Sequence, residues 1–393
     1  MFSSRLPWDV PTNRLSQALV GRRQAGAEIL DLTESNPTRA GFSYPAEEIL
    51  AALAGSAALL YEPAPAGLPT ARQAVAAYYA ERGRAVEPSR ILLTASTSEA
   101  YAFLFKLLAN PGDEILVPTP SYPLFDHLAA LESLRLRRYP LHYHHGWFLD
   151  TEALAAAVSP ATRAILVVSP NNPTGSFLKR HEMEFLCALC ARRELALIAD
   201  EVFADYALAP DPDRVPSLAG SDAVLTFSLN GLSKYAGLPQ MKLAWMVVGG
   251  PDDLRRRALE RLELIADTYL SVAAPVQHAL PRLLAAGRRV QPQIAARLRG
   301  NLEALSALVR QQAVCELLRV EGGWYAVLRL PRTHSEEQWV VELLERDGVL
   351  VQPGFFYDFP SEAFLVLSLL TPPAVFAEGA HRLLRRAGAS GAV

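Results

Sequence analysis

Short runs of apolar residues alternate with amphipathic stretches through the first two thirds of the chain. Each run has the length of a strand and is bounded by turn-forming residues, whereas the stretches between them have a helical period. Strands that are apolar throughout and alternate with helices are typical of a mostly parallel sheet with helices on both faces. The predicted strands are 90–94, 114–117, 164–168, 195–199 and 223–227, and the helices between them include 46–60, 69–82, 99–108, 150–158 and 180–193.

The pattern changes at both ends of the chain. Prolines and a polar, turn-rich stretch interrupt residues 1–45, which we expect to form an N-terminal arm that joins the smaller domain. Residues 46–282 form the predicted large domain. Beyond 283, a long helix and a few strands predict a small C-terminal α+β domain over 283–393, with a helix at 290–311 and strands at 324–330 and 364–370.

Composition and charge exclude several classes of protein. The chain has 393 residues, of which 50% are hydrophobic, and a formal net charge of −3, which gives no electrostatic footprint for nucleic acid or an acidic membrane. The start has no apolar core of signal-peptide length, and no apolar run is long enough for a membrane span. Neither nucleic acid nor a membrane is therefore an expected partner.

The three cysteines indicate in which cellular compartment the protein would be found. Cys187 and Cys190 form a C-x-x-C pair, but within an apolar run of helical period that favours buried thiols over a redox motif. With Cys315 the number is odd, and the start of the sequence has no leader pattern, so we expect a reducing cytoplasm.

Ligands of a parallel α/β sheet bind beyond the carboxyl ends of the strands, and polar residues cluster at these ends here. Ser96, Thr97 and Ser98 follow the first strand, at the start of a helix, where N–H groups and hydroxyls can bind an anion. An ordinary helix N-cap is an equally good interpretation of these three residues taken alone.

Three further strand ends carry candidate chemistry. Tyr122 stands on a proline-framed loop, where it could stack on a planar ring. Asn172 belongs to an Asn-Asn-Pro-Thr-Gly turn, and a bare turn has no need of two asparagines. Asp200 directly follows a buried strand, where a carboxylate is costly unless a positive group, such as a protonated ring nitrogen, pairs with it.

Lys234 lies between two apolar runs, in the stretch Asn230-Gly231-Leu232-Ser233-Lys234. A desolvated lysine has a lowered pKa, and its neutral amine can form a Schiff base with a carbonyl compound. The alternative is a loop-tip lysine with its ammonium group in water.

A histidine cluster, His142, His144 and His145, could suggest a metal. No carboxylate or cysteine set accompanies it, and the region has the pattern of a surface strand and hairpin. We therefore expect a solvated loop and no metal site.

An anion site, an aromatic residue, Asn172, Asp200 and Lys234 thus follow one another at successive strand ends. In this order, and in the segments 172–175 (Asn-Pro-Thr-Gly) and 231–238 (Gly-Leu-Ser-Lys-Tyr-Ala-Gly-Leu), the chain resembles the class I/II aminotransferases of fold type I. The resemblance covers about residues 30–380. It implies the fold type I architecture, pyridoxal 5′-phosphate as cofactor, and 46–282 as the cofactor-binding domain.

The resemblance also implies residue roles. Lys234 would hold the cofactor as a Schiff base and later move a proton between the substrate and the cofactor. Asp200 would pair with the ring nitrogen, Asn172 would bind the ring oxygen O3′ and Tyr122 would stack on the ring.

The phosphate would be held by Ser96, Thr97 and Ser98. Tyr61 matches a tyrosine that reaches the phosphate of the neighbouring subunit. That match implies a two-fold homodimer with its sites at the interface.

Three positions depart from the family pattern. Phe203 replaces a tyrosine that usually donates to O3′, and the reach of the nearby Tyr206 is open. Lys242 stands in place of an arginine that grips the phosphate, which keeps the charge but loses the two-pronged geometry. Val366 stands where an arginine usually clamps the substrate α-carboxylate.

Another residue would have to supply that clamp. Arg39 is the first candidate, with Ser35 and Asn172 as further substrate-binding candidates, and Arg329 is a weaker one.

We therefore expect a homodimeric, cytoplasmic aminotransferase that moves an amino group between an amino acid or amine donor and a 2-oxo acid by a ping-pong route. A lyase, decarboxylase or oxidase on the same cofactor is the alternative, because Val366 removes the usual clamp. A non-catalytic regulator is a third hypothesis, but the chain has no spare helix-turn-helix segment and keeps both Lys234 and Asp200.

Overall fold

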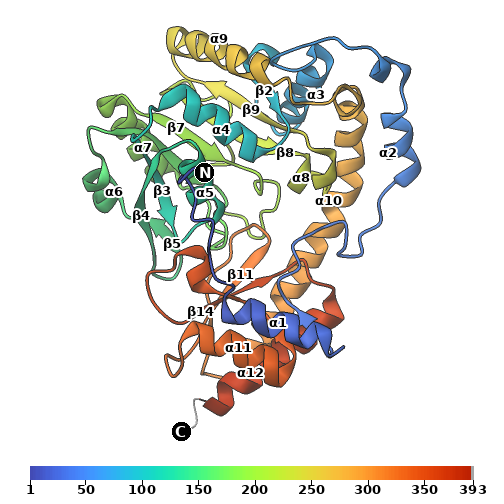
Figure 1. Ribbon diagram of the computed structural model, residues 1–393, viewed down its shortest axis with the longest axis vertical. Helices are drawn as coiled ribbons and strands as arrows, with labels where there is room; N and C mark the ends of the chain where they lie inside the picture. The colour runs from blue at the N-terminus through green and yellow to red at the C-terminus, as the bar shows by residue number, and fades with distance from the viewer. Residues whose placement is uncertain (391–393) are drawn as a thin grey trace.

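The computed structural model describes residues 1–390 and divides into an upper part around a large sheet and a lower part around a small one (Figure 1). The large sheet has eight strands in the order β2-β9-β8-β7-β6-β3-β4-β5. Their bounds are β2 (Ile91–Thr94), β3 (Glu114–Thr119), β4 (Arg135–Tyr143), β5 (Trp147–Leu149), β6 (Thr162–Val168), β7 (Ala196–Asp200), β8 (Thr226–Gly231) and β9 (Ala244–Gly249).

The middle of this sheet is parallel. Strands β4, β3, β6, β7 and β8 pair in parallel, whereas β9 runs antiparallel to both β8 and β2, and β5 runs antiparallel to β4. Because the carboxyl ends of β3, β6, β7 and β8 meet at one edge, the residues that follow them are brought together. The predicted mostly parallel sheet is confirmed.

Helices cover both faces of the large sheet, because successive strand residues point to opposite sides. Leu166 and Ile198 pack on the face beneath α4, α5 and α9, and Ile165 and Leu197 pack on the face beneath α6 and α7. Ile91 packs against α3 and α10. The helices of this part are α2 (Ala46–Leu53), α3 (Pro69–Ala80), α4 (Thr97–Leu108), α5 (Leu124–Leu131), α6 (Thr151–Ala157), α7 (Arg180–Arg193), α8 (Leu232–Tyr235), α9 (Asp252–Tyr269) and α10 (Ala274–Val309).

The lower part is a four-stranded antiparallel sheet with helices, ordered β10-β11-β14-β13. The N-terminal segment joins it, since β1 pairs in parallel with β12 and α1 lies beside α11 (Figure 1). The elements are α1 (Arg14–Gln24), β1 (Leu30–Asp31), β10 (Glu316–Leu317), β11 (Tyr325–Arg329), α11 (Glu336–Asp347), β12 (Val349–Leu350), β13 (Gln352–Pro353), β14 (Phe364–Ser368) and α12 (Pro373–Ser390).

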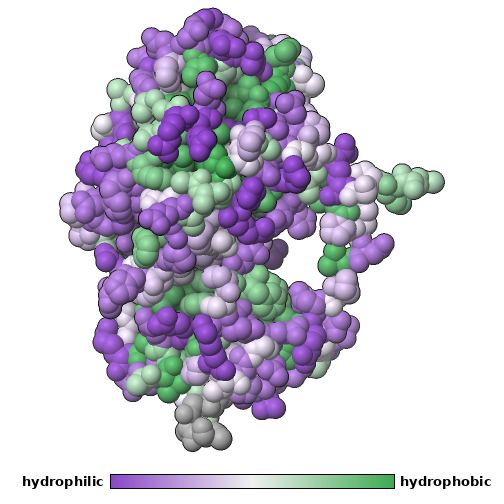
Figure 2. Space-filling view, turned by 90° about the vertical axis from the view of Figure 1, so that its left-hand side faces the viewer, coloured by the Kyte–Doolittle hydropathy of each residue, from purple (hydrophilic) through white to green (hydrophobic). Residues whose placement is uncertain are grey.

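Helix α10 connects the two parts. It is 36 residues long and continues through Pro281 and Pro292, so the boundary that we predict between 282 and 283 falls inside one helix. The division into 1–45, 46–282 and 283–393 stays a prediction, and its last residues, 391–393, lie outside the described part of the chain. From the side, the space-filling view shows an upper and a lower lobe and a slender segment that stands away from them (Figure 2).

Three element predictions are wrong in their bounds. The helix predicted at 290–311 is the second half of α10, which begins at Ala274. The helix predicted at 46–60 ends at Leu53, and a short 3₁₀ turn, η1 (Ser56–Leu59), follows Gly55. The strand predicted at 223–227 is β8, which runs on to Gly231 and brings Asn230 into the sheet. Polar Asn230 is accommodated there because its side chain oxygen accepts the Gly231 N–H.

The structure also bears on two predictions, that no membrane span and no metal site would be found. Over residues 1–390, none of the helices is both long and apolar enough to cross a membrane. His142 and Tyr143 lie on β4, in the expected hairpin with β5, and His142 pairs with Asp150 at 3.0 Å. Within the same residues, no group of three or more histidine, cysteine or acidic side chains is gathered as a metal site would require.

Candidate active site

A cavity of about 290 Å³ opens at the carboxyl ends of β6, β7 and β8, between the two parts of the chain. Its wall contains one acid and one base, Asp200 and Lys234, among hydroxyl-bearing and aromatic side chains. Of the residues predicted for the site, it brings together Ser35, Ser96, Thr97, Ser98, Tyr122, Asn172, Asp200 and Lys234.

Lys234 reaches this cavity from α8, a single helical turn directly after β8. Its ammonium nitrogen lies 4.8 Å from the ring centroid of Trp324 and 5.3 Å from that of Phe203. Burial lowers the pKa of Lys234 from 10.5 to about 8, and the negative charge of Asp200 opposes this shift. The neutral amine that a nucleophile must be is therefore far more populated here than in an exposed lysine.

Asp200 ends β7 and is only 7% exposed. Its Oδ2 accepts a 2.6 Å hydrogen bond from the Tyr101 phenol, and its Oδ1 accepts one of 3.1 Å from the Val202 N–H. Burial raises the pKa of Asp200, whereas these two hydrogen bonds and Lys234 lower it. The carboxylate is thus held in one orientation beside the cavity with a positive partner within electrostatic reach.

The two asparagines of the turn after β6 differ in their contacts. Asn171 is structural, because its Oδ1 accepts from the Thr174 hydroxyl at 2.9 Å. Asn172 lines the cavity, and its buried Oδ1 has no partner among the described residues. A buried amide oxygen without a hydrogen bond is costly, which marks Asn172 as the member of the pair with a ligand to bind.

The turn before α4 forms a helix N-cap and also offers free donors to an anion, the two roles that its sequence predicts. Ser96 is the N-cap of α4 and accepts from the Glu99 N–H at 3.2 Å, while the Glu99 carboxylate accepts from the Ala95 N–H at 2.7 Å. Thr97 and Ser98 stand in the first turn, where main-chain N–H groups have no partner within the helix. A helix N-terminus that opens on a cavity with hydroxyls around it is a good site for a phosphate.

Aromatic side chains form the remaining walls. Tyr122 is 41% exposed, and Phe203 and Tyr325 pack edge to face at 6.4 Å between ring centroids. Phe203 provides no hydroxyl, and Tyr206 does not replace it: its phenol donates to the main-chain oxygen of Lys234 at 2.7 Å. Tyr206 therefore does not act as the missing donor to O3′, because its hydroxyl is bound to the turn that carries Lys234.

Several predicted residues are not in the wall of this cavity. Tyr61 is 80% exposed on the segment before α3. Lys242 follows the short 3₁₀ turn η3 (Pro239–Met241) and does not line the cavity, although Pro239 does.

No arginine lines the cavity in the described chain. Val366 is fully buried in β14, between Val327 and Gln352 of the neighbouring strands. Arg39 is exposed on the turn that follows Ser35, and Arg329 is exposed and paired with Glu316. An α-carboxylate clamp is thus absent from the residues that face the cavity in this conformation.

Sequence reasoning missed Tyr101, Tyr325 and Ser233, which also line the cavity. A signal for Tyr101 existed: it stands four residues after Thr97 on α4, and so on the same face of the helix as the predicted anion site. No pattern indicated Tyr325, because it comes from the other sheet.

Comparisons with known proteins agree on one family. The family model "Aminotransferase class I and II" matches residues 27–383. A glutamate-pyruvate aminotransferase of Escherichia coli is 27% identical over 377 residues, which cover 92% of this chain and 93% of that protein. An alanine aminotransferase of Mycobacterium tuberculosis is 26% identical over 359 residues, which cover 88% of this chain and 82% of that protein.

Solved structures share the fold. An alanine aminotransferase from Pyrococcus furiosus superposes with a TM-score of 0.88 at 22% identity and covers 99% of this chain and 100% of its own. A mutant aspartate aminotransferase from Thermus thermophilus gives a TM-score of 0.83 at 23% identity, covering 98% of this chain and 99% of its own. The fold type I architecture that the sequence predicts is confirmed.

Proposed function

Because the chain belongs to the class I and II aminotransferases, we propose that it moves an amino group between an amino acid or amine donor and a 2-oxo acid, with Lys234 as the residue that binds the cofactor. Amino-group transfer and dependence on pyridoxal 5′-phosphate come with the family. We propose in addition the classes of donor and acceptor and the role of each residue. The observation that carries it is the meeting of Lys234 and Asp200 in one cavity. A lyase, decarboxylase or oxidase is not favoured, since the relatives are named as aminotransferases.

The residues present fit the cofactor. The cavity combines a lysine with a lowered pKa, a buried carboxylate, a helix N-terminus with hydroxyls and the buried side-chain amide of Asn172, whose Nδ2 can donate. These four features match the aldehyde, the ring nitrogen, the phosphate and the ring hydroxyl of pyridoxal 5′-phosphate. When bound, that group acts as an electron sink, which stabilises negative charge on the substrate carbon next to the nitrogen.

Lys234 has two tasks in this proposal. Its neutral amine, favoured by burial, is the group that would hold the cofactor. With a donor bound, the amine at Nζ would be the base that accepts a proton from the donor carbon and later gives it back. The rings of Trp324 and Phe203 keep water from that nitrogen and so help to hold its pKa near the working pH.

Asp200 supports the reaction electrostatically. Its carboxylate would pair with the protonated ring nitrogen, which keeps the electron sink effective. The hydrogen bonds from Tyr101 and Val202 hold the carboxylate in place and favour its charged form.

The phosphate and the ring have their own proposed contacts. Ser96, Thr97 and Ser98 would hold the phosphate at the start of α4. Lys242, which does not line the cavity, stays a proposed phosphate contact on the sequence alone. Tyr122 would stack on the ring, and Asn172 would bind O3′.

We propose a homodimer with its sites at the interface. Tyr61 would reach the phosphate of the neighbouring subunit. The exposure of Tyr61, and of Leu59 and Leu60 beside it at 89% and 63%, supports a covered surface here, because such residues are rarely left in water together. Mixing a Tyr61→Phe and a Lys234→Ala subunit in one dimer tests this arrangement. A Tyr61 that crosses to the neighbouring site puts both changes in one site and leaves the other intact, whereas a Tyr61 that serves its own site leaves both sites damaged.

Arg39 would supply the carboxylate contact in place of Val366, with Ser35 and Asn172 nearby. Its guanidinium is exposed and makes no ion pair within residues 1–390, so it is available for a substrate that arrives at the turn beside Ser35. Small molecules are the proposed partners. We propose the cytoplasm as compartment, where the three free thiols would stay reduced.

A donor panel tests the proposal. Purified protein loaded with pyridoxal 5′-phosphate is mixed with single amino acids and amines, and the absorbance of the cofactor is followed without an acceptor. Transfer predicts conversion to the pyridoxamine form and its reversal by a 2-oxo acid. Release of ammonia and pyruvate from a donor with a β-leaving group, with no pyridoxamine form, would contradict it.

A further inference from the structure

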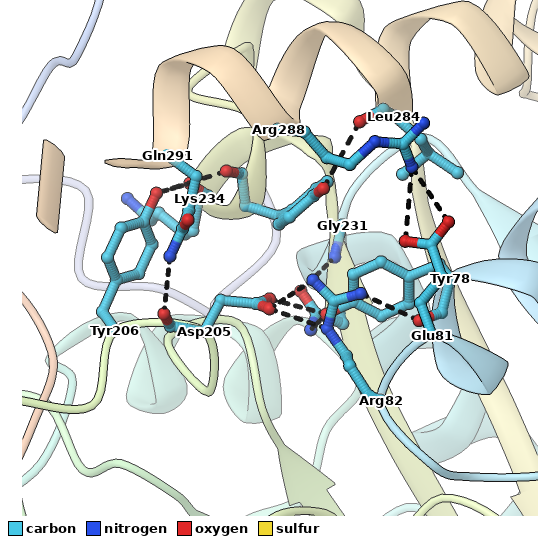
Figure 3. A network of polar contacts seen from close by, with 12 residues as sticks. Tyr78, Glu81, Arg82, Asp205, Tyr206, Gly231, Lys234, Leu284, Arg288 and Gln291 are labelled. Atoms are coloured by element: carbon cyan, nitrogen blue, oxygen red, sulfur yellow. Dashed lines mark hydrogen bonds and ion pairs between the residues drawn. The ribbon is translucent and has the colours of Figure 1, made fainter. Parts of the chain in front are cut away.

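The turn that carries Lys234 is held by two consecutive residues of a loop far from it in sequence, Asp205 and Tyr206 (Figure 3). Helix α8 has only four residues, Leu232–Tyr235, and a helix of one turn leaves most of its carbonyl oxygens without helical partners. The Gly237 N–H donates to the Lys234 oxygen at 3.3 Å, and the rest of the support for this main-chain position comes from outside the helix.

Tyr206 supplies such a contact at the end of the turn. Its hydroxyl donates to the Lys234 oxygen at 2.7 Å and lies 3.2 Å from the Tyr235 oxygen. Burial, and then the charge of Asp205, raise the pKa of Tyr206 well above its ordinary value, so the phenol stays a donor.

Tyr206 is itself rigid. It is 1% exposed, and its ring packs edge to face on Trp324 at 5.4 Å, the same indole that lies 4.8 Å from Lys234 Nζ. Its main-chain N–H donates to Phe203 at 2.9 Å, and its oxygen accepts from Gly323 at 3.0 Å. A phenol fixed in this way can set the position of the carbonyl that it binds.

Asp205 holds the start of the same turn. Its carboxylate accepts from the Tyr78 hydroxyl at 2.6 Å and from Arg82 at 2.6 and 2.8 Å. Tyr78 in turn accepts from Asn230 Nδ2 at 3.1 Å, and Asn230 Oδ1 accepts the Gly231 N–H at 2.7 Å.

The network also reaches helices on either side. Gln291 of α10 donates to the Asp205 oxygen at 2.9 Å, and Arg288 of the same helix pairs with Glu81 at 3.0 Å beside Arg82 (Figure 3). The Arg82 guanidinium lies 3.6 Å from the ring centroid of Tyr78, which adds a cation–π contact to the salt bridge. The loop of Asp205 and Tyr206 is thereby anchored to α3 and α10.

We propose that Tyr206 is a positioning residue for Lys234, with Asp205 as its anchor. This inference rests on the proposed function, since it concerns the lysine that binds the cofactor and moves the proton. Proton transfer is sensitive to small displacements of the reacting nitrogen, so a turn that can drift lowers turnover without weakening substrate binding. Tyr206 does not line the cavity and touches no reacting atom.

The chain offers a matched pair of variants. Tyr206→Phe removes only the hydroxyl on the lysine turn and keeps the ring on Trp324. Tyr79→Phe removes another buried hydroxyl, 3.2 Å from Trp245 Nε1, from a tyrosine whose ring packs on Tyr78 at 5.1 Å. Both lose one buried hydroxyl near the network, but only the first loses a contact with Lys234.

Two measurements are made on each variant. The first is kcat and KM of the enzyme loaded with pyridoxal 5′-phosphate, with the best donor of the panel. The second is the pKa of the Lys234 amine in the cofactor-free protein, by NMR of labelled lysine. This signal is resolvable because the chain has only Lys106, Lys179, Lys234 and Lys242.

For Tyr206→Phe we expect kcat to fall about three- to tenfold with KM within about twofold of wild type, and the Lys234 titration to move. Tyr79→Phe should leave both unchanged. If Tyr206→Phe does not fold, Asp205→Asn carries the test, with the same pattern expected because it loosens the anchor.

A Tyr206→Phe variant with wild-type kcat and an unmoved Lys234 titration overturns the inference, as does an equal fall in kcat for Tyr79→Phe. A wild-type protein that binds no cofactor or transfers no amino group overturns the proposed function instead, so the two failures are distinguishable.

Discussion

The phenol of Tyr101 donates a 2.6 Å hydrogen bond to Oδ2 of Asp200, so a buried carboxylate at the end of β7 is held by a buried tyrosine of α4. A hydrogen bond to a charged acceptor favours the charged form. Burial raises the pKa of Asp200, and Tyr101 is the first of the groups that oppose this shift.

Tyr101→Phe should therefore raise the pKa of Asp200 further. The reason is that the carboxylate loses its strongest donor while burial is unchanged. Carboxyl NMR of the cofactor-free protein, with the signal assigned by its loss in Asp200→Asn, measures this value. An unchanged or lower pKa would show that the hydrogen bond does not stabilise the ionised form.

The amine of Lys234 should titrate with a pKa of about 8 in the cofactor-free protein, well below the ordinary value of 10.5. Asp200→Asn should lower it further, because the negative charge of Asp200 is what opposes the effect of burial. Lysine NMR across pH 6 to 11 gives both values. A pKa of Lys234 at its ordinary value would contradict the desolvated environment on which its nucleophilic role depends.

Glu201 should make the protein less stable as the pH rises through the weakly acidic range. Burial raises the pKa of Glu201 from 4.5 to about 7 in the folded state, so the folded protein binds the proton more tightly than the unfolded chain. The stabilisation by this proton is complete below pH 4.5 and is lost as the pH approaches 7, by at most about 3 kcal/mol at 1.36 kcal/mol per pH unit.

Urea unfolding at pH 5 and pH 7.5 measures this loss, and Glu201→Gln should reduce it. The exposed Glu260, paired with Arg256, provides a control, since Glu260→Gln should leave the difference as in wild type. A Glu201→Gln protein with the full wild-type pH dependence would assign the effect to other groups.

Arg39→Ala should raise KM for carboxylate-bearing substrates by an order of magnitude or more, because a hydrogen bond to a charged group contributes about 1.5–3 kcal/mol. Steady-state kinetics with an amino acid and with the corresponding amine separate this effect from a general loss. Arg329→Ala is the matched control, since Arg329 is engaged with Glu316. An unchanged KM in Arg39→Ala would dismiss the residue as the carboxylate contact.

The sequence allowed the main features of the site to be predicted because strand order and chemistry are both local signals. A buried apolar run followed by Asp200, or by the turn of Asn172, fixes where a side chain leaves a parallel sheet. Since parallel strands end at one edge, residues as distant as Ser96 and Lys234 could be expected in the same cavity, where the structure has both.

The contacts that support the site could not be predicted, because they join elements that are distant in the sequence. The hydrogen bond from Tyr101 to Asp200 joins residues 99 positions apart, and Tyr206 reaches Lys234 through a loop whose path has no periodic pattern. The bounds of β8 were missed because Asn230, a turn-favouring residue, is kept in the strand by its own contacts with Gly231 and Tyr78.

The central claim is that Lys234 binds pyridoxal 5′-phosphate and carries out amino-group transfer. Its most direct test is the visible spectrum of the wild-type protein and of Lys234→Ala, each incubated with the cofactor and then with an amino donor. The wild type should show the absorbance of covalently bound cofactor and convert it to the pyridoxamine form, whereas Lys234→Ala should show neither that bound species nor turnover. A Lys234→Ala protein that transaminates at the wild-type rate would contradict the account.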